Sequence, residues 1–218
     1  QHIDYILREI LLNEPDIVAF SCYLWNIEMV RSLSKAIKSV RPDLVIIYGG
    51  PEVSYTGKDE MTHHSFVDYI IQGEGEEVFR QLYNHLERLD PRPQTGLVYR
   101  DCGSVVEQLP SIGLVMDEIP FPFDDDLSDL ENRILYYETS RGCPFNCQYC
   151  LSSIEKGVRF KSLSIVYKEL DFFLKKQVRQ VKLVDRTFNT KKDHALSIMN
   201  YIIERDNGIT NFHFEVAP

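Results

Sequence analysis

Leu44-Val-Ile-Ile-Tyr48, followed by Gly49-Gly50-Pro51-Glu52, is a short apolar run that stops at two glycines. An unbroken run of this length is typical of a parallel strand that is covered on both faces. The same pattern precedes it in Asp16-Ile-Val-Ala-Phe-Ser-Cys22. It follows again in Val67 to Ile71, which leads to Gly73-Glu74-Gly75-Glu76. These runs predict three strands of one parallel sheet.

Amphipathic helices are expected around these strands. Apolar residues recur every three or four positions before the first strand, between the first two and after the third, as in helices with one buried face. They are Ile3, Ile6, Leu7, Ile10 and Leu11, then Val30, Leu33, Ile37 and Val40, then Val78, Leu82 and Leu86. Helices alternating with strands predict a doubly wound, Rossmann-like α/β domain over residues 1–90. Because only three strands follow from the pattern, we expect this sheet to be incomplete, with one or two N-terminal strands upstream.

Residues 91–133 differ in character and predict a linker. Two runs rich in β-formers, Gly96 to Arg100 and Ser104 to Glu107, flank the turn Asp101-Cys102-Gly103 and predict a β-hairpin. Several prolines and the acidic run Asp124-Asp125-Asp126 then indicate an extended crossing between domains.

Strands and helices alternate again over residues 134–218. Strands are expected at Leu135–Thr139, Val181–Asp185 and Phe212–Val216, with helices between them. Three strand–helix units cannot close a barrel. This part is therefore expected to be the beginning of a partial TIM-type barrel that continues beyond Pro218.

Composition excludes several classes of protein. The chain has 218 residues, of which 44% are hydrophobic and 26% charged, as in globular proteins. A net charge of −9 argues against a nucleic-acid coat or a binder of anionic membranes. No apolar run is long enough to cross a bilayer and no signal peptide is visible, so a cytoplasmic protein is expected. The basic stretch 156–192 predicts an exposed helix face, with a substrate-facing surface as the alternative.

Three of the five cysteines form the pattern Cys143-x3-Cys147-x2-Cys150 at the expected end of a strand. A structural zinc site needs four ligands, commonly in CxxC pairs, and no second pair exists. Cys22 and Cys102 lie far away along the chain. Three close cysteines without a fourth favour an iron–sulfur cluster with one open iron.

The segment Thr139-Ser-Arg-Gly-Cys143-Pro-Phe-Asn-Cys147-Gln-Tyr-Cys150 resembles the CxxxCxxC signature of radical S-adenosylmethionine (SAM) enzymes. The first half resembles the cobalamin-binding domain found in one branch of that superfamily, through Gly49-Gly50-Pro51-Glu52 and Asp68-Tyr-Ile-Ile-Gln-Gly73-Glu74-Gly75-Glu76. The resemblance implies that Cys143, Cys147 and Cys150 ligate three irons of a [4Fe–4S] cluster. SAM would then bind the fourth iron.

The resemblance also implies further contacts with SAM. Tyr149 would lie beside the adenine. Asp185 would replace a Gly-Gly-Glu motif that this chain lacks, and Glu215 would reach the methionine or ribose; for Asp185 and Glu215 a helix cap or an ion pair is the alternative. An electron donor such as flavodoxin or ferredoxin is implied as a partner.

The expected cobalamin site lies at the carboxyl ends of the three N-terminal strands, where open α/β sheets bind ligands. Its residues are Ser21, Gly49, Gly50, Gly73, Glu74 and Gly75. The Asp-x-His-x-x-Gly motif, which supplies a histidine ligand to cobalt in many cobalamin domains, does not occur. Either the cofactor binds without such a ligand or the motif lies upstream of Gln1.

The implied function is reductive cleavage of SAM coupled to cobalamin-dependent methyl transfer to an unactivated centre; the residues do not reveal the substrate. Two alternatives remain. One is a radical SAM enzyme of another reaction type whose first domain does not bind cobalamin. The other is a non-catalytic protein that binds an iron–sulfur cluster or zinc. We expect residues 1–218 alone to be inactive.

Overall fold

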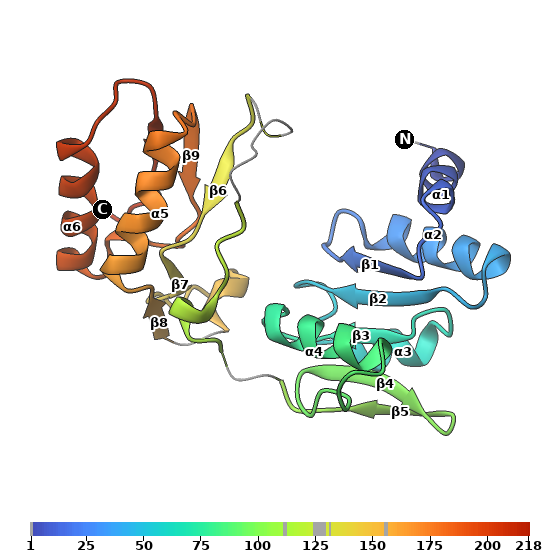
Figure 1. Cartoon of the computed structure of the whole chain (residues 1–218). Helices are drawn as coiled ribbons and strands as arrows, with labels where there is room; N and C mark the ends of the chain where they lie inside the picture. The colour runs from blue at the N-terminus through green and yellow to red at the C-terminus, as the bar shows by residue number, and fades with distance from the viewer. Residues whose placement is uncertain (1, 111–112, 124–129, 131, 155–156) are drawn as a thin grey trace. The chain divides into compact units, whose positions relative to one another are not determined.

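The computed structural model describes residues 2–110, 113–123, 130, 132–154 and 157–218. The chain forms two compact units, Gln1–Gly113 and Leu114–Pro218 (Figure 1). The first unit holds one sheet in the order β1-β2-β3-β4-β5. Its strands are Ile17–Ser21 (β1), Val45–Gly49 (β2), Tyr69–Ile71 (β3), Leu97–Asp101 (β4) and Ser104–Glu107 (β5). Its helices are Ile3–Leu12 (α1), Ile27–Val40 (α2), Gly57–His63 (α3) and Glu76–Leu86 (α4).

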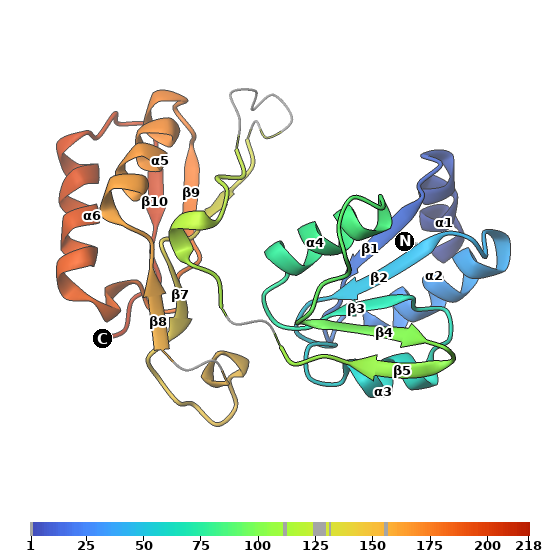
Figure 2. The same ribbon diagram turned by 60° about the horizontal axis from the view of Figure 1, so that its bottom comes forward.

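The first three strands are parallel, and helices cover both faces of their sheet. Successive residues of β2 point to opposite sides: Ile46 and Tyr48 pack in the core with α2, whereas Ile47 packs in the core with α4. Figure 2 shows α3 and α4 on opposite faces of the sheet. This confirms the predicted doubly wound α/β fold with a parallel-dominated sheet.

The β-hairpin that the sequence places in a linker belongs to the sheet of the first unit. Strand β4 pairs antiparallel with β3, and β5 pairs with β4. Leu97 and Tyr99 of β4 enter one core and Val98 enters the other, so β4 is apolar on both faces. The division into residues 1–90, 91–133 and 134–218 stays a prediction, and the acidic run at 124–126 lies outside the described residues.

The second unit repeats the strand–helix pattern around a smaller parallel sheet, in the order β10-β9-β6. Its strands are Leu135–Tyr137 (β6), Ser140–Cys143 (β7), Gly157–Phe160 (β8), Gln180–Leu183 (β9) and Asn211–His213 (β10). Its helices are Leu163–Lys175 (α5) and Lys192–Glu204 (α6), with 3₁₀ turns Met116–Glu118 (η1), Leu151–Ser153 (η3) and Phe188–Thr190 (η4). Buried Phe173 contacts Phe121, Phe123 and Tyr137 edge-on. Among the described residues, no helix has the length and apolarity that a bilayer span requires.

Gly50 is the glycine on which the carboxyl edge of the first sheet depends. Its φ is +100°, and an added Cβ would lie 2.8 Å from the carbonyl oxygen of Cys22. Gly103, in the β4–β5 turn, also has a positive φ of +83°, but a Cβ there would meet nothing within 4 Å.

We predict that Gly50→Ala lowers the free energy of unfolding of the first unit by about 1–3 kcal/mol more than Gly103→Ala, because only Gly50→Ala adds a backbone clash to the strained φ. Urea unfolding followed through the single tryptophan, Trp25, measures both variants in the first unit. Equal losses of unfolding free energy in the two variants would show that the close approach of Gly50 to Cys22 adds nothing to the destabilisation.

Candidate functional site

A β-hairpin carries the three clustered cysteines. Strands β7 and β8 pair antiparallel, with Ser140 opposite Phe160 and Cys143 opposite Gly157. Cys143 is therefore the last paired residue, and Cys147 and Cys150 lie in the loop that follows. The amide of Cys150 donates a hydrogen bond to the carbonyl of Cys147 (3.1 Å), which folds the loop back on itself. The sequence predicted a loop after a strand, but not the hairpin.

The thiols of the loop are suited to metal binding. None of the five cysteines forms a disulfide; Cys143 is half-buried, while Cys147 and Cys150 are exposed. Hydrogen bonds from the backbone and then the hydroxyl of Ser152 lower the pKa of the Cys150 thiol. They favour the thiolate, which is the form that ligates metals.

The two remaining cysteines are poor candidates for a fourth ligand. Cys22 is fully buried in the first unit, and burial raises its pKa to about 12, so the thiol stays protonated at neutral pH. Cys102 lies exposed in the β4–β5 turn. Within the described part of the chain, no three metal-ligating side chains are gathered closely enough to hold a metal ion. The chemistry of three thiols on one loop fits an iron–sulfur cluster, and their role as ligands stays a prediction.

Asp185 lies beneath the start of the hairpin. It follows β9 and is only 1% exposed. One carboxylate oxygen accepts hydrogen bonds from the hydroxyls of Thr139 (2.7 Å) and Ser140, and the other accepts one from the amide of Thr139 (3.2 Å). Thr187, two residues later, has its hydroxyl 4.0 Å from the thiol of Cys143. The predicted contact of Asp185 with SAM is not tested by this arrangement.

The end of β8, which pairs with the start of β7, is also anchored, through a buried ion pair. Lys161 follows β8, and its ammonium lies 2.8 Å from the Glu169 carboxylate on α5; both side chains are less than a tenth exposed. The hydroxyl of Tyr137 donates to the same carboxylate (2.7 Å). Burial, followed by this hydrogen bond, raises the pKa of Tyr137. The amide of Lys161 donates to the carbonyl of Thr139 (2.8 Å), which joins the two anchors.

Tyr149 and Glu215, the other expected SAM contacts, lie at the surface of this unit. Tyr149 is 94% exposed beside Cys150. Glu215 forms a partly exposed ion pair with Lys182 of β9 (3.2 Å), and its carbonyl accepts a hydrogen bond from the amide of Phe188 (2.8 Å). Both side chains are accessible to a ligand, and their contacts with SAM stay predictions.

The expected cobalamin residues lie at the carboxyl ends of β1, β2 and β3. Ser21 ends β1 opposite Gly49 at the end of β2. Gly73 has a φ of +76°, and its amide contacts the hydroxyl of Ser54 (3.3 Å). Glu74 is half-buried, and Gly75 precedes the first turn of α4.

The fold does not require glycine at two of these positions, Gly49 and Gly75. An added Cβ at Gly49 would lie 4.0 Å from Ile71, and one at Gly75 would lie 3.6 Å from the same side chain, both ordinary contact distances. Neither residue has a positive φ. The fold thus explains Gly50 and Gly73, whereas Gly49 and Gly75 are available for the close approach of a ligand.

The loop after β1 carries exposed aromatic residues that the sequence analysis did not single out. Leu24 is 78% exposed and Trp25 is 80% exposed. The rings of Tyr23 and Trp25 stack with centroids 4.6 Å apart. Three large apolar residues in succession, Tyr23, Leu24 and Trp25, shortly after a predicted strand were the available signal.

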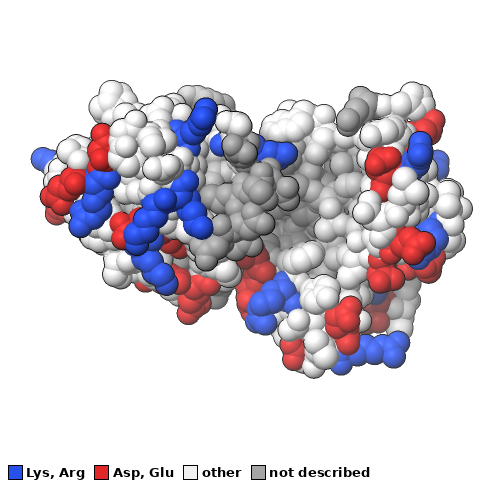
Figure 3. All heavy atoms as spheres, turned by 45° about the horizontal axis from the view of Figure 1, so that its top comes forward, with Lys and Arg blue, Asp and Glu red and all other residues white. Residues whose placement is uncertain are grey.

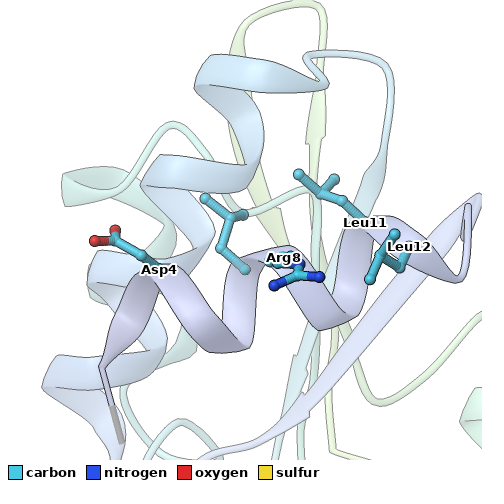
Figure 4. A pocket seen from close by; sticks show the side chains of 5 residues that line it. Asp4, Arg8, Leu11 and Leu12 are labelled. Atoms are coloured by element: carbon cyan, nitrogen blue, oxygen red, sulfur yellow. The ribbon is translucent and has the colours of Figure 1, made fainter.

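Other surface features carry no expected site residue. The basic residues Lys168, Lys175, Lys176 and Arg179 are exposed on α5 and the turn after it, as predicted for a helix face. Figure 3 shows Lys and Arg side chains grouped on a face of the second unit. An apolar hollow of about 370 Å³ runs along α1 (Figure 4). It is lined by Asp4, Leu7, Arg8, Leu11 and Leu12.

The hairpin requires glycine at Gly142 of β7 but not at Gly157 of β8. Gly142 has a φ of +106°, and an added Cβ would lie 2.1 Å from the carbonyl oxygen of Gly157. Gly157 has a φ of +90°, but a Cβ there would meet nothing within 4 Å. We predict that Gly142→Ala abolishes the protection of the β7 and β8 amides in hydrogen exchange, while Gly157→Ala, the control, retains most of it. Equal protection in both variants would contradict the close backbone approach.

Comparisons with known proteins agree with this geometry. Residues 1–83 match the family model described as a B12 binding domain. The chain is 28% identical over 193 residues to 2-(S-pantetheinyl)-carbapenam-3-carboxylate methyltransferase of Streptantibioticus cattleyicolor, covering 81% of this chain and 28% of the relative. It is 27% identical over 196 residues to the cobalamin-dependent radical SAM methyltransferase TokK of Streptomyces tokunonensis, covering 80% and 28%.

The solved structure of the cobalamin-dependent SAM radical enzyme OxsB, with aqua-cobalamin and SAM bound, has the same fold. It superposes with a TM-score of 0.78 at 23% identity, covering 97% of this chain and 32% of that one. The chain thus spans less than a third of the length of each of these three proteins. It contains a B12-binding domain and is a homologue of cobalamin-dependent radical SAM methyltransferases.

Proposed function

We propose that the protein is a cobalamin-dependent radical SAM methyltransferase that acts on an unactivated centre. The observation that carries this proposal is the combination, in one chain, of a B12-binding domain with three cysteines on one loop, none of them in a disulfide. The homologous methyltransferases support the type of reaction. The thiols require a reducing environment, so the proposal places the enzyme in the cytoplasm.

The residues of the second unit have defined parts in this proposal. Cys143, Cys147 and Cys150 hold a [4Fe–4S] cluster, and the exposed Tyr149 and Glu215 contact SAM. When bound, the cluster supplies the electron that cleaves SAM. The exposure of Cys147 and Cys150 also leaves this loop open to a protein that reduces the cluster, such as a flavodoxin or ferredoxin.

We place the cofactor at the carboxyl ends of β1, β2 and β3, where glycines leave open space and an apolar surface lies nearby. Gly49 and Gly75 admit a bulky ring system because no Cβ stands in its way. Ser21, Gly50, Gly73 and Glu74 line the same strand ends. The exposed ring of Trp25, stacked on the half-buried ring of Tyr23, lies in the loop after β1 and offers an apolar surface beside them.

We predict that hydroxocobalamin quenches most of the emission of Trp25 in the 218-residue chain, because a bound corrin absorbs at the wavelengths of tryptophan emission. Gly49→Ala and Gly75→Ala should each weaken the Kd about tenfold while leaving stability nearly unchanged, because each added methyl group meets the fold only at ordinary contact distance but narrows the space for the ligand. Gly103→Ala, outside this edge, is the control and should bind like the native chain.

Quenching must saturate and must exceed the inner-filter effect measured with free N-acetyltryptophanamide. Unchanged emission would contradict cobalamin binding. Equal affinities in all three variants would place the cofactor away from Gly49 and Gly75.

We predict that anaerobic reconstitution gives a reduced [4Fe–4S] cluster whose EPR signal shifts on addition of SAM, because SAM binds the open iron. Cys147→Ala should lose the signal, since it removes one of three ligands. Cys102→Ala is the matched control, and its spectrum should not change.

Different results would separate the possible functions. Stoichiometric zinc without a cluster would overturn the enzyme proposal. A SAM-responsive cluster without cobalamin binding would leave a radical SAM enzyme but exclude the cobalamin-dependent reaction. Turnover in the full-length protein is then followed as transfer of a labelled methyl group from SAM.

A further inference from the structure

We propose that Asp185 is a positioning residue that fixes the start of the cysteine hairpin, and that it does not hold SAM. The inference rests on the proposed function, because it concerns the cluster held by the hairpin. The resemblance implied that Asp185 contacts SAM. We infer instead that its carboxylate holds the hairpin in place.

The hydrogen-bonding capacity of Asp185 is directed at the hairpin. Its two oxygens accept three hydrogen bonds, all from Thr139, which precedes β7, and Ser140, the first residue of β7. The side chain is 1% exposed. A contact with the ammonium group of SAM would require an accessible carboxylate oxygen, and the packing around Asp185 provides none.

The anchored segment leads directly to the first cysteine. Ser140 begins β7, and Cys143 ends it three residues later. On the other side of Asp185, the amide of Val184 donates to the carbonyl of Tyr137 (2.8 Å), which ties β9 to the end of β6. Asp185 therefore joins the parallel sheet to the strand that carries Cys143, much as the outer hydrogen-bond partners of metal ligands orient those ligands.

A buried carboxylate without a cation beside it is stable only when its oxygens are well hydrogen-bonded. The three donors from Thr139 and Ser140 meet this need. Removing the carboxylate leaves two buried hydroxyls and one amide without their acceptor. The strand that starts at Ser140 then loses its fixed attachment to β9.

Asparagine distinguishes the two tasks. Its amide oxygen can accept from the amide of Thr139 while its NH₂ group donates to the two hydroxyl oxygens, so Asp185→Asn retains three hydrogen bonds without the charge. A positioning role predicts that Asp185→Asn assembles a native cluster. A SAM-binding role predicts a loss of SAM affinity of about tenfold or more in the same variant, because a charged partner has been removed.

The experiment compares the native chain with Asp185→Asn, Asp185→Ala and Thr139→Val, with Asp171→Asn as the control. Asp171 accepts a hydrogen bond from Tyr201 between α5 and α6 and makes no contact with the hairpin in its described interactions. Hydrogen exchange of the cofactor-free chain should show lost protection at the amides of β7 and at Lys161 in Asp185→Ala. Thr139→Val should show the same change to a smaller degree.

After reconstitution, Asp185→Ala should bind iron about 10- to 100-fold more weakly and show altered g-values without SAM, whereas Asp185→Asn should match the native chain in both. Adding Thr139→Val to Asp185→Ala should cause no further loss, because both changes remove the same interaction. Because Thr139→Val removes a single buried hydroxyl, it keeps the test decisive if Asp185→Ala fails to fold.

Two results would overturn the inference. One is native exchange and a native SAM-free EPR spectrum in both Asp185→Ala and Thr139→Val. The other is a loss of SAM affinity in Asp185→Asn while its cluster is unchanged. Absence of a cluster in the native chain would instead contradict the proposed function, and the exchange data would still decide whether Asp185 anchors the hairpin.

Discussion

A parallel sheet has to be covered on both faces, and this requirement organises the first unit. Each parallel strand is followed by a helix that returns across one face, so β1, β2 and β3 all end at the same edge. Ile46 and Ile47, adjacent in β2, enter opposite cores for the same reason. In the loops at that edge, Cys22 and Val53 reach the core, and Gly50 passes close to Cys22. An edge of this kind can be adapted to a large ligand without disturbing the sheet.

In the second unit, too, the elements that hold the structure together are distinct from the loop that carries the candidate site. The parallel strands β6 and β9 and helix α5 provide rigid attachment points, and the hairpin extends from them. A carboxylate and an ion pair, all buried, fix its two ends at Ser140 and Lys161. The reactive groups then lie on a short loop at the surface. Buried charges of this sort are weak contributors to stability but effective in fixing one geometry.

The sequence predicted those parts of the molecule whose signal is local. The apolar runs at Leu44–Tyr48 and Val67–Ile71 identified buried strands, and the cysteine spacing identified the candidate site. The pairing of β7 with β8 was not predicted. Each strand has only four residues, too few for a clear pattern in the sequence, and the close approach of Gly142 to Gly157 depends on the folded backbone. Helix α3 was not predicted, since Gly57–His63 is short and largely polar. The partners of Asp185 lie 45 and 46 residues earlier in the chain, beyond the reach of any local pattern.

The anchoring of the hairpin has a consequence for the order in which such a protein matures. In a zinc finger the metal drives folding, because little else holds the ligands together. Here the strands on either side of the cysteine loop are joined by backbone pairing, and their far ends are fixed by protein groups alone. Under the proposed function, the scaffold is therefore complete before iron and sulfide bind. Loss of the proposed cluster to oxygen would then leave a folded chain whose exposed loop can bind a cluster again.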